Sequence, residues 1–210
     1  MRILIACEYS GIVRDAFTKQ GHYAVSCDLL PTESDGPHIQ GDISEVIRDD
    51  RCGRWYQSKW DMMIAFPPCT YLCSSGLHWN KRKPERAAKT ESALDFVRLL
   101  LNAPIDKIAL ENPVGCISTR IRKPDQAIQP HQFGHDASKR TCLWLKGLPK
   151  LHPTALVEPR TVNGKPRWSN QTDSGQNRLG PSEDRWKIRS QTYSGIARAM
   201  AEQWSDPCKT

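Results

Sequence analysis

Two short motifs place groups that could react together at the ends of apolar segments. Pro67-Pro68-Cys69 follows the apolar run 60–66, and Glu111-Asn112-Pro113 closes the apolar run 107–111. A thiolate and a carboxyl group that face one pocket suit covalent addition to an electron-poor ring, in which the acid hydrogen-bonds a ring nitrogen. The two motifs therefore predict a nucleophile and an acid in one active site.

Both residues have other interpretations. A lone cysteine often serves as a small buried hydrophobic side chain, and Cys73, four positions after Cys69, could pair with it as a metal ligand. Zinc sites normally need four such ligands, and no second pair at ligand spacing follows, so we predict no metal site. Glu111 could simply be solvated at a strand end, although burying it without a partner would cost several kcal/mol.

The order of apolar and amphipathic segments predicts an α/β fold. Short apolar runs predict strands at 3–7, 23–27, 38–42, 60–66, 107–111 and 141–145, and helical spacing predicts helices at 13–21, 44–47, 84–101 and 193–204. This alternation indicates an open, mainly parallel sheet with helices on both faces.

Polar residues follow the predicted strands at regular places. In sheets of this kind, ligands bind beyond the carboxyl ends of the strands. Here those ends carry Cys7-Glu8, Asp28, Asp42, Pro68-Cys69 and Glu111-Asn112. We therefore expect the chemistry of the protein at this edge of the sheet.

The rest of the chain divides less clearly. Residues 70–83 predict a mobile loop behind Cys69, and residues 156–189 are rich in Gly, Pro, Asn, Ser and Arg without sustained periodicity. We expect a catalytic core over 1–155, a reduced recognition region over 156–190, and a C-terminal helix within 191–210 that returns to the core.

The length and composition limit the class of protein. The 210 residues are 38% hydrophobic, enough for one medium domain, and no window approaches an uninterrupted apolar span of about 18 residues. The N-terminus shows no secretory cleavage pattern, so we expect a soluble cytoplasmic protein without a membrane partner. In a reducing compartment the eight cysteines should be free thiols or ligands.

The positive charge of the chain has two explanations, nucleic-acid binding and a solvated basic surface. The net charge is +7, and basic residues gather at 81–83 and 185–189, with Arg160, Lys165 and Arg167 nearby. Basic residues interleaved with tryptophan suit a phosphate backbone with stacked bases. A solvated surface would explain the same charges.

The two motifs, in this order on an α/β sheet, resemble the DNA (cytosine-5)-methyltransferases, and in particular their short members from bacteriophages and prophages. The resemblance covers most of the chain: residues 7–11 resemble the first cofactor loop, 129–149 a later block that contacts the active site, and 192–197 the final block. It implies a Rossmann-like S-adenosylmethionine-dependent methyltransferase fold, S-adenosylmethionine as cofactor and a flipped cytosine in DNA as substrate.

The resemblance also implies a role for each matched residue. Cys69 would attack C6 of cytosine, Glu111 would hold a proton toward N3, and Arg140 would orient the pyrimidine carbonyl. Cofactor contacts would come from Cys7, Glu8, Ser10, Gly11, Asp28, Asp42, Pro67, Thr192 and Tyr193, and substrate contacts from Asn112, Ser74 and Trp79.

Two features depart from the family pattern. Glu8 and Ser10 stand where cofactor-loop glycines are expected and only Gly11 remains, although a Glu8 carboxylate could still bind the cofactor's amino group. The recognition region is also far smaller than usual. Two alternatives therefore stay open: the same chemistry on a free cytosine nucleotide or single-stranded nucleic acid, and a non-catalytic DNA-binding or regulatory protein. Adenine and exocyclic-amine methyltransferases typically carry an aromatic residue where this chain has Cys69.

Overall fold

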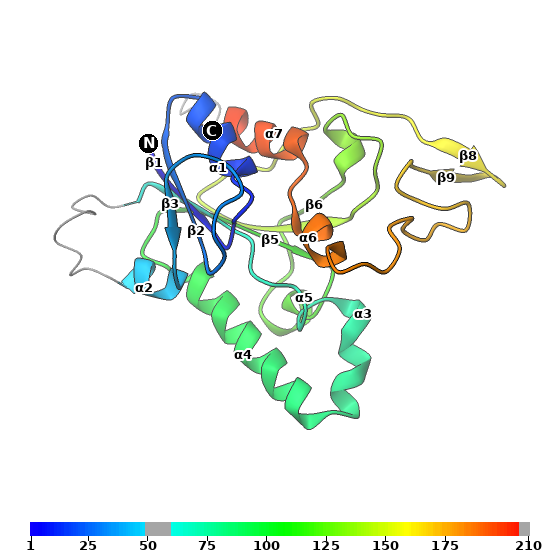
Figure 1. Ribbon diagram of the computed structural model, residues 1–210, viewed down its shortest axis with the longest axis horizontal. Helices are drawn as coiled ribbons and strands as arrows, with labels where there is room; N and C mark the ends of the chain where they lie inside the picture. The colour runs from blue at the N-terminus through cyan, green and yellow to red at the C-terminus, as the bar shows by residue number, and fades with distance from the viewer. Residues whose placement is uncertain (49–59, 206–210) are drawn as a thin grey trace.

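A seven-stranded sheet forms the centre of the protein, which a computed structural model describes over residues 1–48 and 60–205 (Figure 1). The strands are β1 (Arg2–Ala6), β2 (Tyr23–Asp28), β3 (His38–Gln40), β4 (Met62–Ala65), β5 (Lys107–Pro113), β6 (Gln126–Ile128) and β7 (Thr141–Lys146). Their order across the sheet is β3-β2-β1-β4-β5-β7-β6.

The sheet is mainly parallel, and its strand order reverses beside β1. β1 pairs in parallel with β2 on one side and with β4 on the other, and β2–β3 and β4–β5 are also parallel. β7 alone among these seven strands runs the other way, antiparallel to both β5 and β6. The predicted α/β class, an open and mainly parallel Rossmann-like sheet with helices on both faces, is confirmed, with β7 as a local exception to the parallel pattern.

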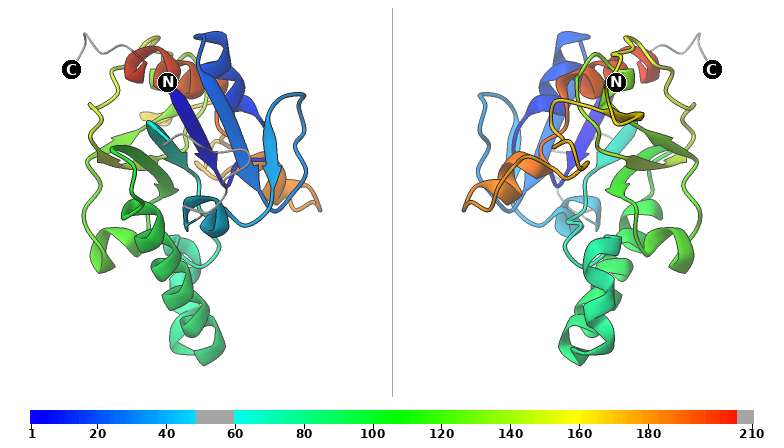
Figure 2. Two further views of the ribbon diagram at one scale, coloured as in Figure 1. Left: turned by 90° about the vertical axis from the view of Figure 1, so that its left-hand side faces the viewer. Right: turned by 90° about the vertical axis from the view of Figure 1, so that its right-hand side faces the viewer.

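Helices cover both faces of the sheet (Figure 2). α1 (Ile12–Lys19) and α7 (Ser194–Trp204) pack on one face, where α1 contributes Val13 and Phe17 to the core and α7 contributes Met200 and Trp204. α2 (Ile43–Arg48), α4 (Pro84–Leu101) and α5 (Ile117–Arg120) cover the other face. Each face of the sheet therefore has its own buried apolar layer.

The sequence pattern explains where the long helix begins and ends. Pro84 stands in the first turn of α4, where a missing amide donor costs nothing. Leu94, Val97 and Leu100 follow at spacings of three and are fully buried, which gives the stripe that packs on the sheet. Asn102 caps the helix end, two residues before Pro104 prevents its continuation.

Short elements form where the sequence predicts loops. α3 (Ser74–Leu77) and η1 (His78–Lys81) occupy the segment expected to be a mobile loop, and β8 (Arg160–Val162), β9 (Lys165–Arg167) and α6 (Arg185–Ser190) lie within the segment expected to be irregular. η2 (Pro130–Gln132) is a further short element. These short segments are mostly polar and contain no apolar run, which is why the pattern missed them.

The predicted division into a core, a recognition region and a C-terminal helix stays a prediction. β8 and β9 form a separate two-stranded sheet, while α7 returns to pack on α1. In the described part of the chain, none of the helices combines the length and the apolar character that crossing a membrane requires.

Candidate active site

Polar groups from several strands meet at the carboxyl edge of the sheet. β4 and β5 are parallel neighbours, with Ala65 paired to Leu110, so the turn that carries Cys69 and the end of β5 that carries Glu111 lie at the same edge. The two groups are close enough to interact, since the charge of Glu111 helps to raise the pKa of the Cys69 thiol. The structure thus brings together the two side chains on which the predicted chemistry depends.

Asn112 ties the turn of Cys69 to β5. Its side chain is 1% exposed, and Nδ2 donates a hydrogen bond of 2.8 Å to the carbonyl oxygen of Pro67. On the other side of the turn, the carbonyl oxygen of Cys69 accepts a hydrogen bond of 3.0 Å from the amide of Cys73. Asn112 therefore has a positioning function here, and its predicted contact with substrate stays a prediction.

The pKa of the Cys69 thiol lies above its ordinary value. Partial burial of the thiol is the largest cause, although the residue as a whole is exposed, and the charges of Cys73 and Glu111 add to it. The ammonium of Lys139 acts in the opposite direction. A thiol of this kind is largely protonated near neutral pH, so only its minor thiolate form is ready for nucleophilic attack.

The pKa of Glu111 is also raised. Burial of the carboxyl is the largest cause, and the ammonium of Lys139 and a hydrogen bond with the Thr141 side chain offset part of the rise. Thr141 begins β7, whose antiparallel register places it opposite Pro113. A carboxyl group that keeps its proton to higher pH than usual suits the role of hydrogen-bond or proton donor.

Lys139 is a third charged group of this site, and the sequence pattern does not identify it. Its ammonium lowers the pKa of both Cys69 and Glu111. Because side chains alternate along an extended chain, Lys139 falls on the same side as Thr141, two residues on, and so toward Glu111. Its Nζ also donates a hydrogen bond of 2.8 Å to the carbonyl oxygen of Arg189, near the end of α6.

Arg140, the predicted catalytic arginine, lies on the other side of the same segment. It is exposed. Burial raises the pKa of the nearby Cys142 thiol, and the guanidinium of Arg140 offsets part of this rise. The cation that shifts the pKa of Cys69 and of Glu111 is Lys139. The register of β7 on β5 decides which of the two adjacent cations faces Glu111, and the catalytic role of Arg140 stays a prediction.

Replacing Lys139 by methionine is expected to raise the pKa of the Cys69 thiol, because it removes a positive charge that lowers this pKa. Peptide mass spectrometry measures the rate at which iodoacetamide alkylates Cys69 over a range of pH. The pH profile of this rate should therefore be displaced to higher pH. Lys146→Met, which removes a lysine from the opposite edge of the sheet, is the control. Overlapping profiles for Lys139→Met and the unaltered protein would contradict this prediction.

A cavity of about 430 Å³ adjoins the same edge and is bounded by α2 and α4. Its volume is in the range of small-ligand sites. Its walls include the predicted cofactor residues Cys7, Asp28 and Asp42, the apolar side chains of Ile43 and Phe96, and Pro68 in place of the buried Pro67. Since Pro68 directly precedes Cys69, a ligand in this cavity would lie next to the predicted nucleophile.

The two carboxylates of the cavity are held by backbone amides. Oδ1 of Asp28 accepts a hydrogen bond of 2.9 Å from the amide of Leu30, and Oδ1 of Asp42 accepts one of 2.8 Å from the amide of Ser44 at the start of α2. Each carboxylate can still accept hydrogen bonds through its other oxygen. Hydroxyl and amino groups of a ligand are suitable donors to these oxygens.

Cys7 lines this cavity at the end of β1 in a strained backbone conformation, with φ of 58°. Non-glycine residues rarely adopt positive φ, and such strain is common at functional sites. Burial, followed by the charge of Asp28, raises the pKa of its thiol far above the ordinary value. Cys7 therefore stays protonated and does not compete with Cys69 as a nucleophile.

Glu8 caps helix α1, and its predicted contact with the cofactor's amino group stays a prediction. The residue is 5% exposed, and Oε1 accepts hydrogen bonds from the amide of Val13 at 2.7 Å and from the hydroxyl of Ser10 at 3.2 Å. Oε2 accepts one from the amide of Arg14 at 3.3 Å. A carboxylate thus already occupies the positive end of α1, and the turn itself engages both of its oxygens.

The other residues predicted to bind the cofactor lie near the turn or away from the cavity. Gly11 has φ of 75°, and a Cβ there would meet the Ser34 hydroxyl at 2.1 Å, so this turn requires glycine. Tyr193 packs on His135, with ring centroids 5.1 Å apart, and Thr192 precedes it. Neither Thr192 nor Tyr193 is among the residues that line the cavity, and their cofactor role stays a prediction.

Asp28→Asn is expected to weaken the binding of S-adenosylmethionine about fivefold or more, since hydrogen bonds to an ionised acceptor are roughly twice as strong as neutral ones. Isothermal titration calorimetry measures the affinity. Asp61→Asn is the matched control, because Asp61 is exposed at the amino edge of β4, where it accepts a hydrogen bond of 2.7 Å from the amide of Arg2. Equal affinities for the two variants would remove Asp28 from the cofactor site.

The segment behind Cys69 is a folded arm. α3 and η1 lead into α4, and the three project together from the sheet (Figure 1). The guanidinium of Arg86 donates hydrogen bonds to the carbonyl oxygens of Thr70 at 2.8 Å and Gly76 at 3.2 Å. The hydroxyl of Thr90 donates one to the carbonyl oxygen of Tyr71 at 3.0 Å. These contacts from α4 explain why the expected mobile loop is helical.

The arm presents an aromatic ring among cations. Trp79 is 43% exposed, and the charged groups of Arg82 and Lys83 lie 5.8 and 5.7 Å from its ring. Ser74, at the base of the arm, is also exposed. An exposed ring flanked by positive charge is suited to stacking on a base beside a phosphate backbone.

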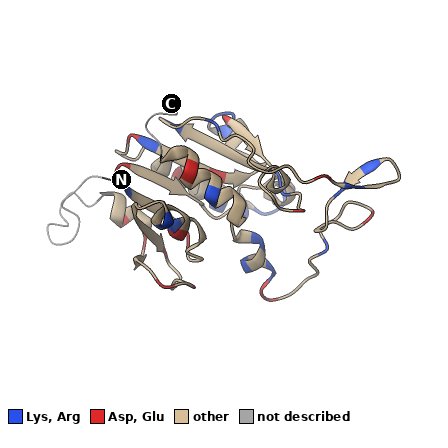
Figure 3. Cartoon of the chain, turned by 90° about the horizontal axis from the view of Figure 1, so that it is seen from above, with Lys and Arg blue, Asp and Glu red and all other residues tan. Residues whose placement is uncertain are grey.

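Residues 156–190, here called the insert, form a second basic projection. β8 and β9 are joined by Asn163-Gly164, whose φ values of 49° and 71° are those of a tight two-residue hairpin turn. Figure 3 shows Lys and Arg on this hairpin, which extends away from the sheet. Arg160 pairs with Asp173 at 2.6 Å, so part of this charge is neutralised within the insert.

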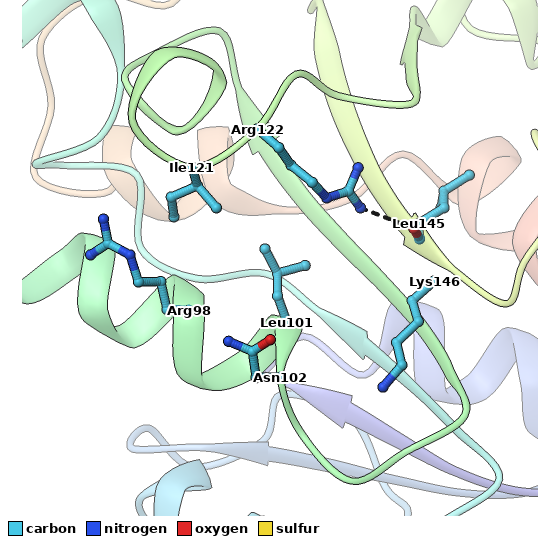
Figure 4. A pocket seen from close by; sticks show the side chains of 7 residues that line it. All are labelled: Arg98, Leu101, Asn102, Ile121, Arg122, Leu145 and Lys146. Carbon is cyan, nitrogen blue, oxygen red and sulfur yellow. Dashed lines mark hydrogen bonds between the residues drawn. The ribbon is translucent and has the colours of Figure 1, made fainter.

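A second cavity, of about 340 Å³, lies at the opposite edge of the sheet (Figure 4). Apolar side chains of Leu101, Ile121 and Leu145 line it together with Arg98, Arg122 and Lys146. Arg122 donates a hydrogen bond of 2.9 Å to the carbonyl oxygen of Leu145. Carboxyl and thiol groups are absent from this lining, so we assign no chemistry to it.

The described residues offer no cluster for a metal ion. Over 1–48 and 60–205, no three His, Cys, Asp or Glu side chains are grouped as ligands would be. The thiol of Cys73, the proposed partner in a metal pair with Cys69, lies 3.2 Å from the hydroxyl of Ser75.

Comparison with known proteins finds likenesses to solved structures. No family model and no curated protein matches the chain. A crystal structure described as a candidate DNA modification methyltransferase encoded within an E. coli prophage superposes with a TM-score of 0.48 at 13% sequence identity, over 75% of this chain and 52% of the other. This chain thus spans about half the length of that structure, and we base no functional conclusion on the likeness.

Proposed function

We propose that this protein is an S-adenosylmethionine-dependent DNA (cytosine-5)-methyltransferase that acts through a covalent bond between Cys69 and C6 of cytosine. The observation that carries the proposal is the placement of Cys69 and Glu111 on neighbouring strand ends, within electrostatic reach of each other and beside a ligand-sized cavity. A nucleophile and a protonated acid are the two groups that C5 alkylation of a pyrimidine requires.

The chemistry of the cavity favours S-adenosylmethionine over a dinucleotide. Phosphate groups of dinucleotides bind at a helix N-terminus of this fold, and the Glu8 carboxylate fills that position at α1. Asp28 and Asp42 line the cavity, and their charges attract a sulfonium cation. S-adenosylmethionine bound there would supply the methyl group that C5 accepts.

The residues of this chain have separate parts in the reaction. The Cys69 thiolate forms a bond to C6, and the electron pair of the C5–C6 double bond moves into the ring while Glu111 donates a proton toward N3. The resulting enamine is nucleophilic at C5, where it takes up the methyl group. S-adenosylhomocysteine would leave as the methyl group is transferred. A solvent water then removes the C5 proton, the electron pair of that bond restores the C5–C6 double bond, and the bond between C6 and sulfur breaks to release the Cys69 thiolate, while N3 returns its proton to Glu111. Lys139 favours the thiolate, since it lowers the Cys69 pKa.

Two basic projections support DNA as the substrate. The arm with Trp79 and the insert with the β8–β9 hairpin both carry cations, which suit phosphate contacts on either side of the active site. A cytosine in a duplex must leave the base stack to reach Cys69. We propose that Trp79 and Ser74 contact the displaced strand or the space that the flipped cytosine leaves in the base stack.

The reduced insert favours a second candidate: the same chemistry on single-stranded nucleic acid or on a free cytosine nucleotide, neither of which needs extensive groove contacts. A non-catalytic DNA-binding protein is the remaining alternative. It gives no reason for Cys69 and Glu111 to stand together. In all three cases we propose that the protein acts in the cytoplasm of a bacterial or phage-infected cell.

Methyl transfer distinguishes these candidates directly. The protein is incubated with S-adenosylmethionine and, in separate reactions, with duplex DNA of mixed sequence, the same DNA as single strands, and dCTP. Nucleosides are then analysed by mass spectrometry. We expect 5-methyldeoxycytidine from the duplex. Product from dCTP or single strands alone would favour the second candidate, and cofactor binding without product from any substrate would favour the non-catalytic one.

A further inference from the structure

Asn170 connects the insert to the active site by a specific set of contacts. We infer that Asn170 is a positioning residue that holds Lys139 toward Cys69 and Glu111, and thereby couples the insert to the reacting groups. The inference rests on the proposed function in taking Cys69 as the nucleophile.

The side chain of Asn170 pairs with the backbone of Ser138 in both directions. Oδ1 accepts a hydrogen bond of 3.0 Å from the amide of Ser138, and Nδ2 donates one of 2.9 Å to the carbonyl oxygen of the same residue. An amide side chain that satisfies both backbone groups of one residue acts like a paired strand and fixes the direction of the chain there. Ser138 immediately precedes Lys139.

Neighbouring contacts hold Asn170 itself. The amide of Ser169 donates a hydrogen bond of 2.9 Å to Oδ1 of Asp136, and the ring of Trp168 stacks on His131 with centroids 4.5 Å apart. The root of the insert is therefore attached to the core at three consecutive residues, 168 to 170.

The remaining restraints on Lys139 come from Gln129 and from the C-terminal end of the insert with the residue that follows it. Its amide donates a hydrogen bond of 2.9 Å to Oε1 of Gln129, and its Nζ donates to the carbonyl oxygens of Arg189 at 2.8 Å and Gln191 at 3.4 Å. Within the described residues the groups whose charges act on Cys69 are Cys73, Glu111 and Lys139. Lys139 is the one of these three whose backbone is set by the insert.

The arrangement gives the insert a way to influence the thiol without touching it. A nucleic acid that binds the insert and tightens or shifts Asn170 would move Ser138 and the base of the Lys139 side chain. Because the Lys139 ammonium favours the thiolate, its distance from Cys69 sets how much thiolate is present. Binding at the insert would then change the reactivity of Cys69.

The test measures Cys69 reactivity in Asn170→Ala. The rate of Cys69 alkylation by iodoacetamide is measured by peptide mass spectrometry. Near neutral pH it should fall about twofold or more, because about twofold corresponds to the smallest interaction energy usually found between residues of one hydrogen-bond network. The whole pH profile should move upward, in the direction of Lys139→Met. Asn177→Ala is the control, since Asn177 accepts a hydrogen bond of 2.8 Å from the amide of Leu179 within the insert and does not contact Ser138.

A double-mutant cycle decides whether Asn170 acts through Lys139. In the Lys139→Met background, Asn170→Ala should leave the alkylation profile unchanged. An unchanged profile for Asn170→Ala alone, an equal shift for Asn177→Ala, or full additivity of the two substitutions would each overturn the inference. Thermal melting by circular dichroism accompanies each variant, and Asn170→Ser replaces Asn170→Ala if the latter is unfolded. Alkylation needs no methyl transfer, so failure here is distinguishable from failure of the proposed function.

Discussion

Cys69→Ala protein is expected to lose methyl transfer by about 10⁴-fold or more, because no other described thiol stands at the reacting position and removal of a covalent nucleophile disables the whole catalytic unit. Cys7, the other thiol at this edge, has its pKa raised far above the ordinary value by burial. Binding of S-adenosylmethionine should persist, since Cys69 is not among the residues that line the cavity.

Two measurements on the same preparation check this expectation. Incorporation of labelled methyl groups into DNA gives the rate, and isothermal titration calorimetry gives the cofactor affinity. Cys73→Ala is the matched control, because it removes a thiol four residues away and should keep the rate within a few-fold of the unaltered protein. Methyl transfer by Cys69→Ala at a rate similar to that of Cys73→Ala would mean that the chemistry uses no bond to Cys69.

Glu111→Gln is expected to lower kcat/KM about 10²- to 10⁴-fold, the usual contribution of a positioned proton donor. The shape of the pH profile should change as well. The active form needs Cys69 as thiolate and Glu111 protonated. Because burial raises both pKa values, kcat/KM should climb with pH up to the Glu111 pKa, stay level up to the Cys69 pKa, and then fall as Glu111 loses its last protonated fraction.

Glutamine cannot titrate, so the profile of Glu111→Gln should keep rising up to the Cys69 pKa and then stay level. The pH dependence of kcat/KM on a DNA substrate measures this. Glu91→Gln, in which an exposed ion pair of 2.9 Å with Arg120 is lost, should keep both the rate and the shape. A profile of Glu111→Gln that still levels off at the original lower pH would show that another group supplies the proton.

The long elements of the fold could be predicted because their sequences repeat a simple pattern. Runs such as 62–65 are buried on both faces of a parallel sheet and are therefore continuously apolar. α7 keeps Ile196, Met200 and Trp204 on one side. By contrast, the direction of β7 depends on its partners: its apolar run would suit either direction, and its pairing with β5 over residues 108–113 decides the matter.

The candidate site could be predicted only in part, for a similar reason. Cys69, Glu111, Asp28 and Asp42 each stand at or just beyond the end of an apolar run, so the sequence places them at one edge once the sheet is assumed. Lys139 stands in a polar segment without any local signal, and only the antiparallel register of β7 turns it, rather than its neighbour, toward Glu111.

The function of Glu8 shows the same limit. Its position in the turn suggests a ligand contact, but hydrogen bonds from the amides of Val13 and Arg14 engage it in capping α1. Which of these two functions a carboxylate has depends on the path of the next turn of chain. That path follows from Gly11 and its close approach to Ser34, which residue types alone do not reveal.

Covalent trapping tests the central claim most directly. The protein and S-adenosylmethionine are incubated with a duplex that contains 5-fluorocytosine, whose fluorine cannot leave C5, so the bond between sulfur and C6 persists after methyl transfer. Intact-mass analysis should show protein joined to DNA carrying one added methyl group, with peptide mapping to Cys69 and no adduct in Cys69→Ala. If the protein binds both the cofactor and the DNA and yet no adduct forms, Cys69 is not the nucleophile and the account is contradicted.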